Sequence, residues 1–331
     1  MDDKKDVMKK ANPLKVKEAA KAIVVIKDEM SKVLFGQDEI VDSLLRALVC
    51  NGHVLVEGVP GIAKTLAIKT LAKVSGCSFK RIQFTADLMP GDIIGMTTFN
   101  PGKGLQIMKG PIFSNFVIAD EINRSPPKTQ SALIEAMQEG QVTIGNTTFQ
   151  LPNPFFVMAN QNPIETEGVY SLPEAQIDRF LFKLIMDYPD QESEERVIEE
   201  NSTFKKFEDY DIKSVISPDK LVLMQKLAHE IYLDKKIKSY IVNIVKKTRS
   251  KDFEYADYIE LGCSPRASIA LYIASKAEAL IKGRNFVIPA DVRAVAKDVL
   301  RHRLILSFKA RADKITPEKI INEILKGIKS P

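Results

Sequence analysis

A glycine-containing loop that leads into a lysine and a threonine is the part of this sequence best suited to bind phosphate. The apolar run at 54–56 is typical of a buried strand, and Gly58 and Gly61 follow it. A helix is expected to begin at about Lys64. Backbone N–H groups in such a loop form a nest for anions, and the helix N-terminus adds partial positive charge. Lys64 can reach the outer phosphates of a nucleotide, and the Thr65 hydroxyl can bind Mg²⁺.

This loop departs from the strict phosphate-binding pattern at Ala63, where glycine ordinarily precedes the lysine. Alanine keeps its backbone N–H and is expected here at a negative φ, so that the nest survives. A position that required a positive φ would disrupt it. The alternative is an ordinary turn between a strand and a helix. The residues assigned to nucleotide binding in this stretch are Gly58, Val59, Pro60, Gly61, Ile62, Ala63, Lys64, Thr65 and Leu66.

Two adjacent carboxylates, Asp120 and Glu121, end a second apolar run at 116–119. Nucleotide hydrolases with a phosphate-binding loop place an acid at this point to hold Mg²⁺. We therefore assign Asp120, jointly with Thr65, to the metal. Glu121 is then positioned to orient and partly deprotonate an attacking water. The alternative is that the paired acids are structural caps at a strand end.

Two asparagines, Asn160 and Asn162, follow the apolar run at 155–159. An amide at this strand end could bind a γ-phosphate or the attacking water. Asn162 is the first candidate for that role. Asn160 is the second candidate, or it satisfies a turn.

Two arginines are candidates for contact with phosphate from more distant segments. Arg179 ends a short helix predicted to begin at a proline, and an arginine can bind phosphate through two parallel hydrogen bonds. A surface arginine in an ion pair is the alternative. Arg266 lies in the first turn of a helix predicted to be capped by Ser264, with Pro265 at its first position. A cation there gains nothing from the helix dipole, which indicates a ligand.

These candidate residues follow short apolar runs that alternate with helical stretches. Strands that are apolar on both faces and alternate with helices favour a parallel sheet with helices on both sides, which is an α/β core. The helix after the paired acids is expected to have Ser125 as its cap and Pro126 as its first residue. The five expected strands cover 54–56, 79–84, 116–119, 155–159 and 180–185.

Two segments interrupt this alternation with sequence typical of β-hairpins. The first, 95–107, turns at Asn-Pro-Gly-Lys-Gly beginning at Asn100. The second, 142–151, has alternating apolar residues around Gly145 and Asn146, a pair suited to a tight turn. Plain surface loops are the alternative for both segments.

A change in composition after Pro189 divides the chain. Strand-like runs end there and helical periodicity dominates afterwards. We therefore predict a helical leader at 1–30, an α/β core at 31–189 that carries both hairpins, and an all-α domain at 190–331.

Composition excludes several classes of protein. The chain has 331 residues, of which 45% are hydrophobic and 27% charged, as in soluble globular proteins. Its first ten residues lack the apolar stretch of a signal peptide, and no run of about 18 apolar residues is present to span a membrane. Three scattered cysteines indicate a reduced, cytoplasmic protein, and the three histidines lack the spacing of metal ligands.

The net charge of +5 is uneven along the chain. Residues 191–331 hold 27 basic and 21 acidic residues, so the basic excess lies in the second half. Such an excess can mark a nucleic-acid site. A solvated helical surface is the interpretation we favour.

With these residues identified, the sequence resembles the MoxR family of AAA+ ATPases. The resemblance covers about 31–310 and is most specific at 88–95, 110–113, 119–124, 161–165 and 172–180. It implies a P-loop AAA+ core with a C-terminal all-α lid domain. It also implies that alanine at position 63 is usual for this family. By position, Lys64 and Thr65 match the Walker A motif, Asp120 and Glu121 match Walker B, Asn162 matches sensor 1, Arg179 the arginine finger, Arg266 sensor 2, and Gly36 with Gln37 the segment that passes the adenine.

The resemblance also implies an activity and partners. It predicts a Mg²⁺-dependent ATPase, with ATP and Mg²⁺ as cofactors, that hydrolyses ATP at the subunit interfaces of a homo-hexameric ring. Family members are cytoplasmic and chaperone-like, and they often act with a von Willebrand A-domain adaptor protein to remodel or mature a client complex. The two hairpins match the helix-2 insert and the pre-sensor-1 hairpin. Because the second hairpin directly precedes the strand of Asn162, we expect it to engage clients or to move with the nucleotide.

A nucleic-acid-dependent AAA+ motor of the MCM helicase type is the main alternative, because the same two hairpins occur there. Against it, the sequence shows no added nucleic-acid module, zinc ribbon or aromatic-plus-basic platform. Nucleic acid is therefore not an expected partner, and DNA-stimulated ATPase activity would separate the two functions. A nucleotide switch that does not hydrolyse is a third interpretation, which the full set of expected catalytic residues disfavours.

Overall fold

The computed structural model describes residues 11–59, 61, 63–162, 168–201 and 207–331. The chain forms two compact units, one of 25–222 and the other of 1–24 together with 223–331. The division between these units passes through helix α1 (Pro13–Met30) and helix α8 (Pro218–Glu230). The domain ranges 1–30, 31–189 and 190–331 remain a prediction, because the units group segments by packing alone.

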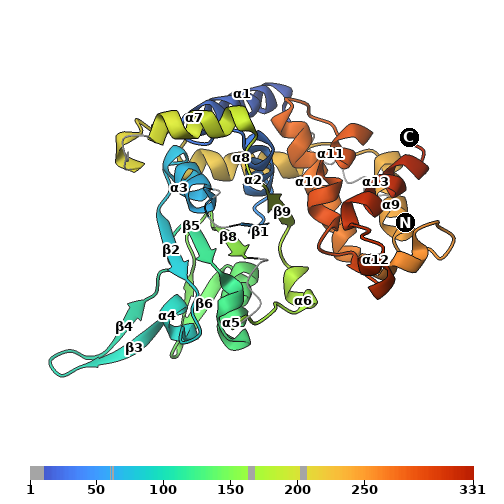
Figure 1. Ribbon diagram of the computed structural model, residues 1–331. Helices are drawn as coiled ribbons and strands as arrows, with labels where there is room; N and C mark the ends of the chain where they lie inside the picture. The colour runs from blue at the N-terminus through green and yellow to red at the C-terminus, as the bar shows by residue number, and fades with distance from the viewer. Residues whose placement is uncertain (1–10, 60, 62, 163–167, 202–206) are drawn as a thin grey trace, which may run out of the picture. The chain divides into compact units, whose positions relative to one another are not determined.

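The first unit is built on a parallel sheet of five strands, as predicted (Figure 1). The order across the sheet is β2-β5-β8-β1-β9, so the strand that leads into the phosphate-binding loop has β8 and β9 as neighbours. The strands are β1 (Val54–Gly58), β2 (Phe79–Gln83), β5 (Phe116–Asp120), β8 (Phe156–Gln161) and β9 (Phe182–Met186).

Helices cover both faces of this sheet because its central strands are apolar on both sides. On one face, Leu55, Val117 and Val157 share a buried cluster with Leu133 and Ile134 of α5 (Pro127–Glu139). On the other face, helix α3 (Lys64–Val74) packs on β2 and β5, and helix α2 (Asp38–Val49) packs on β9. Successive residues of a strand point to opposite faces, so continuous apolar runs require this double cover.

The start of α5 differs from the prediction by one residue. A 3₁₀ turn, η1 (Ile122–Arg124), follows β5, and the helix begins at Pro127 with Pro126 as its cap. The Ser125 hydroxyl donates instead to the carbonyl of Ile122, at 3.4 Å. The expected cap therefore closes the 3₁₀ turn.

Both predicted hairpins are present. Strand β3 (Gly95–Asn100) pairs with β4 (Gly104–Lys109), and β6 (Gln141–Ile144) pairs with β7 (Thr147–Gln150) across the turn at 145–146. The first hairpin follows α4 (Pro90–Ile94) and extends away from the sheet in Figure 1. A Cβ on Gly95 would lie 2.2 Å from the Met108 carbonyl oxygen, so only glycine fits at the base of this hairpin.

Short elements complete the first unit. They are α6 (Glu174–Ile177), α7 (Gln191–Asn201) and η2 (Phe207–Asp209). Helix α7 is acidic in its first turn, where Glu192 and Glu194 lie.

The second unit is helical apart from one short antiparallel pair, β10 (Ile259–Leu261) with β11 (Ile305–Leu306). Its central helix, α10 (Pro265–Ile281), is capped by the Ser264 hydroxyl as predicted. The other elements are α9 (Lys235–Lys247), η3 (Ala256–Tyr258), α11 (Pro289–Leu300), α12 (Phe308–Ala312) and α13 (Pro317–Gly327). Over the described part of the chain, no helix combines the length and the apolar character that crossing a bilayer would need.

Candidate functional site

A cavity of about 450 Å³ lies at the carboxyl ends of β1, β5 and β8. In open parallel sheets, ligands bind at this edge of the strands. The size is that of a site for a small molecule such as a nucleotide. The lining residues are Gly61, Ala63, Lys64, Thr65, Leu66, Arg81, Asp120, Glu121, Asn160 and Asn162.

The loop between β1 and α3 places its backbone at this cavity. Gly61 and Ala63 both have left-handed φ values, 86° and 62°. The expectation of a negative φ at Ala63 is therefore wrong. The chain must turn from a strand into a helix within a few residues, and left-handed steps of this kind form anion nests. For alanine this conformation costs about 1–2 kcal/mol. Pro60 and Ile62 lie outside the described residues.

Lys64 begins α3 and directs its ammonium back over the loop. Its Nζ donates a hydrogen bond to the carbonyl oxygen of Gly58 at 2.6 Å. Burial lowers the pKa of Lys64, while the carboxylates of Asp120 and Glu121 act in the opposite direction. The ammonium therefore faces two anions across the cavity, in a place where a phosphate group would compete for it.

Asp120 ends β5 with its carboxylate held from two sides. One oxygen accepts hydrogen bonds from the guanidinium of Arg81, with Nε at 2.9 Å. The other accepts a hydrogen bond from the side-chain amide of Asn160. The residue is only 9% exposed, so its charge depends on these partners.

Glu121 follows directly and has an unusual backbone for its residue type. Its φ of 55° is left-handed. One carboxylate oxygen accepts a hydrogen bond from the amide of Gln83 at 2.7 Å, and the guanidinium of Arg124 lies 3.3 Å from the same oxygen. The backbone N–H of Glu121 donates to the side-chain oxygen of Asn160 at 2.6 Å. The strained backbone turns this carboxylate toward the cavity, as is common for residues at functional sites.

The two asparagines at the end of β8, Asn160 within it and Asn162 just after it, therefore differ in their surroundings. Asn160 is 2% exposed and uses both ends of its amide, one for Asp120 and one for the backbone of Glu121. Asn162 is 7% exposed and lines the same cavity. The order of candidates, Asn162 first and Asn160 second, stays a prediction, and the contacts of Asn160 are those of a residue that positions the paired acids.

Sequence reasoning missed two residues of the site, Arg81 and Gln83. Both lie on β2, which pairs with β5 so that Gln83 is opposite Asp120. They are two residues apart and therefore point to the same face of the sheet. Polar residues at alternating positions of an expected apolar strand were the available signal.

Four predicted residues lie elsewhere. Gly36 and Gln37 line a separate cavity of about 520 Å³ with residues of β9 and α7, and the Gln37 amide donates to the Asp187 carbonyl at 3.4 Å. Arg179 is exposed and does not line the cavity of Lys64. Arg266 is exposed at the start of α10, in the second compact unit.

The paired acids and the loop fit a divalent cation. Mg²⁺ takes hard oxygen ligands, and the Asp120 carboxylate and the Thr65 side chain line one cavity. A cation bound there would share the Asp120 carboxylate with Arg81. The arrangement can accept a cation, a chain of phosphates and a water near a carboxylate.

Comparisons with known proteins agree with this geometry. A family model described as the ATPase family associated with various cellular activities matches residues 53–182, and an AAA lid domain model matches 254–324. Chaperone MoxR1 of Mycobacterium tuberculosis is 46% identical, with the match covering 92% of this chain and 81% of that protein. The uncharacterised protein YeaC of Bacillus subtilis is 45% identical, over 92% and 93% of the two chains. The solved structure of a suspected ATPase from Cytophaga hutchinsonii is 43% identical, with a TM-score of 0.89 over 96% and 97% of the chains.

Proposed function

The chain belongs to the MoxR family of AAA+ ATPases and is an ATP hydrolase, and on this premise we propose how and where it acts. We infer that it hydrolyses ATP with Mg²⁺ at the interfaces between subunits of a hexameric ring. The energy released remodels or matures a client protein complex. This function rests on one observation above all, the convergence of Lys64, Thr65, Asp120, Glu121 and Asn162 on one cavity.

Each of these residues has a role that follows from its chemistry. Lys64 and the loop N–H groups bind the phosphates, and the Gly58 carbonyl holds the ammonium nearby. Asp120 and Thr65 hold Mg²⁺, which neutralises charge on the phosphates when bound. Glu121 accepts a proton from water, and Asn162 orients the water or the γ-phosphate. Gly36 and Gln37 contact the adenine.

Arg179 acts on a neighbouring subunit. Its side chain is exposed and lies outside the cavity of its own chain, and among the residues that the structure describes it has no hydrogen bond or ion pair. An arginine finger stabilises the charge of the transition state and raises turnover about 10³–10⁵-fold. Arg266 contacts the γ-phosphate from the lid, either within its own subunit or across an interface.

Mixing two inactive variants tests the shared site. Arg179→Ala and Glu121→Gln should each bind ATP and hydrolyse almost none. In mixed rings, an Arg179→Ala subunit with its intact Glu121 borrows Arg179 from a Glu121→Gln neighbour, so part of the activity returns. Subunit exchange is first confirmed by labelling. If subunits exchange and no ratio restores turnover, the finger does not act between subunits.

The client and the adaptor are proposed from the family to which the chain belongs and not from the residues of the site. We propose a client protein complex and a von Willebrand A-domain adaptor as partners, both in the cytoplasm. All three cysteines are free thiols, which is in keeping with a reducing compartment. Glu121→Gln should retain ATP and stay bound to both proteins. A pull-down with this variant in ATP, compared with Lys64→Ala as the nucleotide-free control, identifies them. Equal recovery with both variants would mean that capture does not depend on ATP.

The nucleic-acid motor is not favoured, because the chain is 46% identical to a chaperone over most of its length. Stimulation of ATP turnover by DNA, measured beside stimulation by a client extract, separates the two functions. If DNA stimulated ATP turnover more than the client extract did, the nucleic-acid motor would be the better function.

A further inference from the structure

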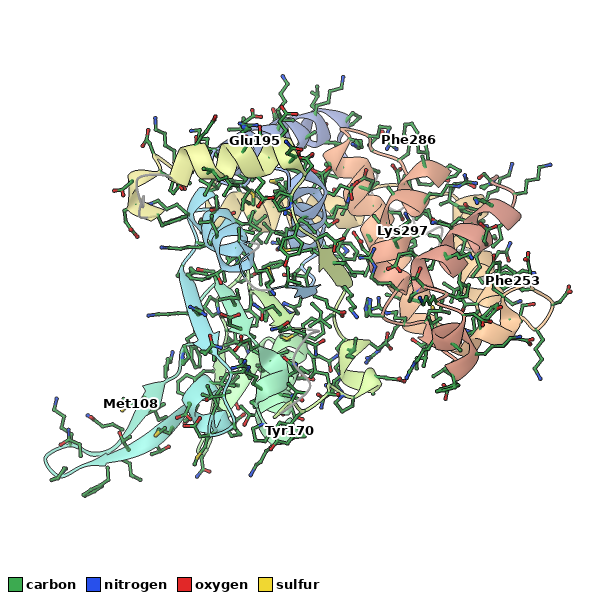
Figure 2. All side chains as sticks on the ribbon, in the orientation of Figure 1. Met108, Tyr170, Glu195, Phe253, Phe286 and Lys297 are labelled. Carbon is green, nitrogen blue, oxygen red and sulfur yellow. The ribbon has the colours of Figure 1, made fainter. Side chains whose placement is uncertain are left out.

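A cavity between helices α11 and α13 gathers positive charge on the second compact unit. It measures about 360 Å³ and contains four cations and one carboxylate, a net charge of +3. The carboxylate, Glu323, is paired with Lys326 at 2.7 Å. The lining residues are Arg293, Lys297, Lys319, Asn322, Glu323, Leu325 and Lys326. Figure 2 labels Lys297 on its helix.

The cations repel one another, and beyond the pairing of Glu323 with Lys326 the acids Asp298 and Glu318 do not relieve the repulsion. Arg293 and Lys297 are four residues apart on α11, a spacing at which like charges destabilise a helix. Two acids of the same helices, Asp298 and Glu318, both pair with Arg301, at 3.0 and 2.8 Å. The ammonium of Lys297 has no ion pair or hydrogen bond with any residue in the described part of the chain. The helix pair therefore carries an electrostatic cost that an anion would remove.

Two of the cations are oriented by neutral partners. Arg293 donates from Nε to the Tyr240 hydroxyl at 3.0 Å and from its terminal nitrogen to the Ser330 hydroxyl at 2.7 Å. Lys319 lies over the ring of Tyr255, 5.9 Å from its centroid. These contacts restrict the side chains, which lowers the entropy lost when a ligand binds. They leave the positive charges of the side chains unneutralised.

We propose that this cavity binds a small ligand with a linear oligophosphate group, either free or attached to a nucleotide. Several cations around one concave site can donate to several phosphate oxygens at once. The cavity has the volume of a small-molecule site. It shares no residue with the cavity of Lys64, so it is a second anion site, away from the proposed hydrolysis.

Because an aromatic surface lies next to Lys319, nucleic acid is an alternative ligand for this region. The rings of Phe253, Tyr255 and Tyr258 follow one another, with centroids 5.7 and 5.9 Å apart, and Lys309 lies over Tyr258. The sequence pattern did not predict this surface, and rings with lysines suit single strands. However, Asp257 pairs with Lys309 and Asp313 with the Tyr258 hydroxyl. These carboxylates would repel a phosphate backbone laid along the rings, which favours the small ligand.

Lysine footprinting tests the site in the full chain. The protein is acetylated with an amine-reactive reagent, with and without tripolyphosphate, and mass spectrometry measures the modification of each lysine. At a concentration several times the dissociation constant, Lys297, Lys319 and Lys326 should be modified about fivefold less, and Lys238 on α9 should be unchanged. ATP is the second probe: protection of these lysines at a lower concentration of ATP than of tripolyphosphate would assign the phosphate to a nucleotide, and the reverse order would assign it to a free oligophosphate. No protection, or equal protection of Lys238, overturns the proposal.

Charge reversal provides the second measurement. Lys297→Glu with Lys319→Glu changes the cavity from +3 to −1. The tripolyphosphate concentration that half-protects Lys326 should then rise at least about tenfold. Lys238→Glu with Lys309→Glu, which makes the same change in charge outside the cavity, should leave this midpoint unaltered. Equal shifts in both variants, or stronger protection of Lys326 by oligothymidine than by tripolyphosphate, would reject the oligophosphate site.

Discussion

The side-chain amide of Gln83 donates a hydrogen bond to the carboxylate of Glu121, with nitrogen and oxygen 2.7 Å apart. The two residues come from neighbouring strands, β2 and β5. The hydrogen bond fixes the position of this carboxylate relative to strand β2. Strand β2 therefore helps to orient the proposed base.

Removing this donor should leave the Glu121 carboxylate less well oriented. We expect Gln83→Leu, which keeps the size of the side chain, to lower ATP turnover about threefold. The measurement is kcat at saturating ATP. In a Glu121→Gln background the same substitution should change nothing, because both changes act on one interaction. An equal change in the two backgrounds would show that Gln83 acts elsewhere.

Asn160 and Asn162, at the end of β8, should separate stability from turnover. Asn160→Ala removes the donor to one oxygen of the buried Asp120 carboxylate and leaves the Glu121 N–H without its side-chain acceptor, so the free energy of unfolding should fall by about 1–3 kcal/mol. Asn162→Ala should lose less stability and lower kcat about a hundredfold. Urea unfolding and steady-state kinetics measure both variants. Full stability in Asn160→Ala would exclude a positioning role.

Ala63 has a φ of 62°, which favours glycine. Ala63→Gly should therefore raise the free energy of unfolding by about 0.5–1 kcal/mol, since relief of the left-handed strain exceeds the added entropy of the unfolded chain. Ala72→Gly, within helix α3, which begins directly after Ala63, should lower it by about 1 kcal/mol. Urea midpoints of the two variants are compared with the parent. A loss of stability in both would indicate that Ala63 is not strained.

His53 makes the stability of the protein depend on pH. Its Nδ1 accepts from the Val157 N–H at 3.0 Å, and Nε2 lies 3.0 Å from the Met137 carbonyl, to which it donates as the neutral ring. Burial lowers the pKa of His53 to about 4. The unfolded chain, with an ordinary pKa near 6.5, binds the proton more readily. This stabilisation is complete above about pH 6.5 and is lost as pH falls toward 4.

Between pH 7 and pH 5 the loss from His53 should be about 2 kcal/mol. Urea unfolding across this range measures the total dependence, and His53→Gln should reduce the slope by the histidine's share. The imidazole resonances supply a check that does not depend on the variant's stability, because the chain has only three histidines. A His53 resonance that titrates near pH 6.5 in the folded protein would contradict the prediction.

The hairpins should differ in how they serve a client. The β3–β4 hairpin exposes Phe99 and Leu105 by 72% and 76%, whereas Val142 and Ile144 of the β6–β7 hairpin are buried. Shortening the loop at 145–146 should keep basal ATP turnover and abolish its response to a client. Phe99→Ser with Leu105→Ser should weaken client binding about tenfold, measured with the Glu121→Gln trap. Unchanged stimulation after the loop is shortened would make the β6–β7 hairpin a structural element only.

The sequence by itself determined the elements and the local chemistry. The phosphate-binding loop, the five apolar strands and the two hairpin turns depend on residues only a few positions apart, so their periodicity and turn chemistry are visible in the chain. Asp120 and Glu121 were identified in the same way, because they directly follow an apolar run.

Only the tertiary structure decided how strands distant in sequence share the site. Strand β5 lies between β2 and β8, so Arg81 and Asn160 hold Asp120 although each is about 40 residues away along the chain. The left-handed backbone at Ala63 is also a consequence of closing the loop between β1 and α3. Strand order, register and loop closure are set by the packing of the whole sheet, and that packing cannot be read from the spacing of residues within one segment.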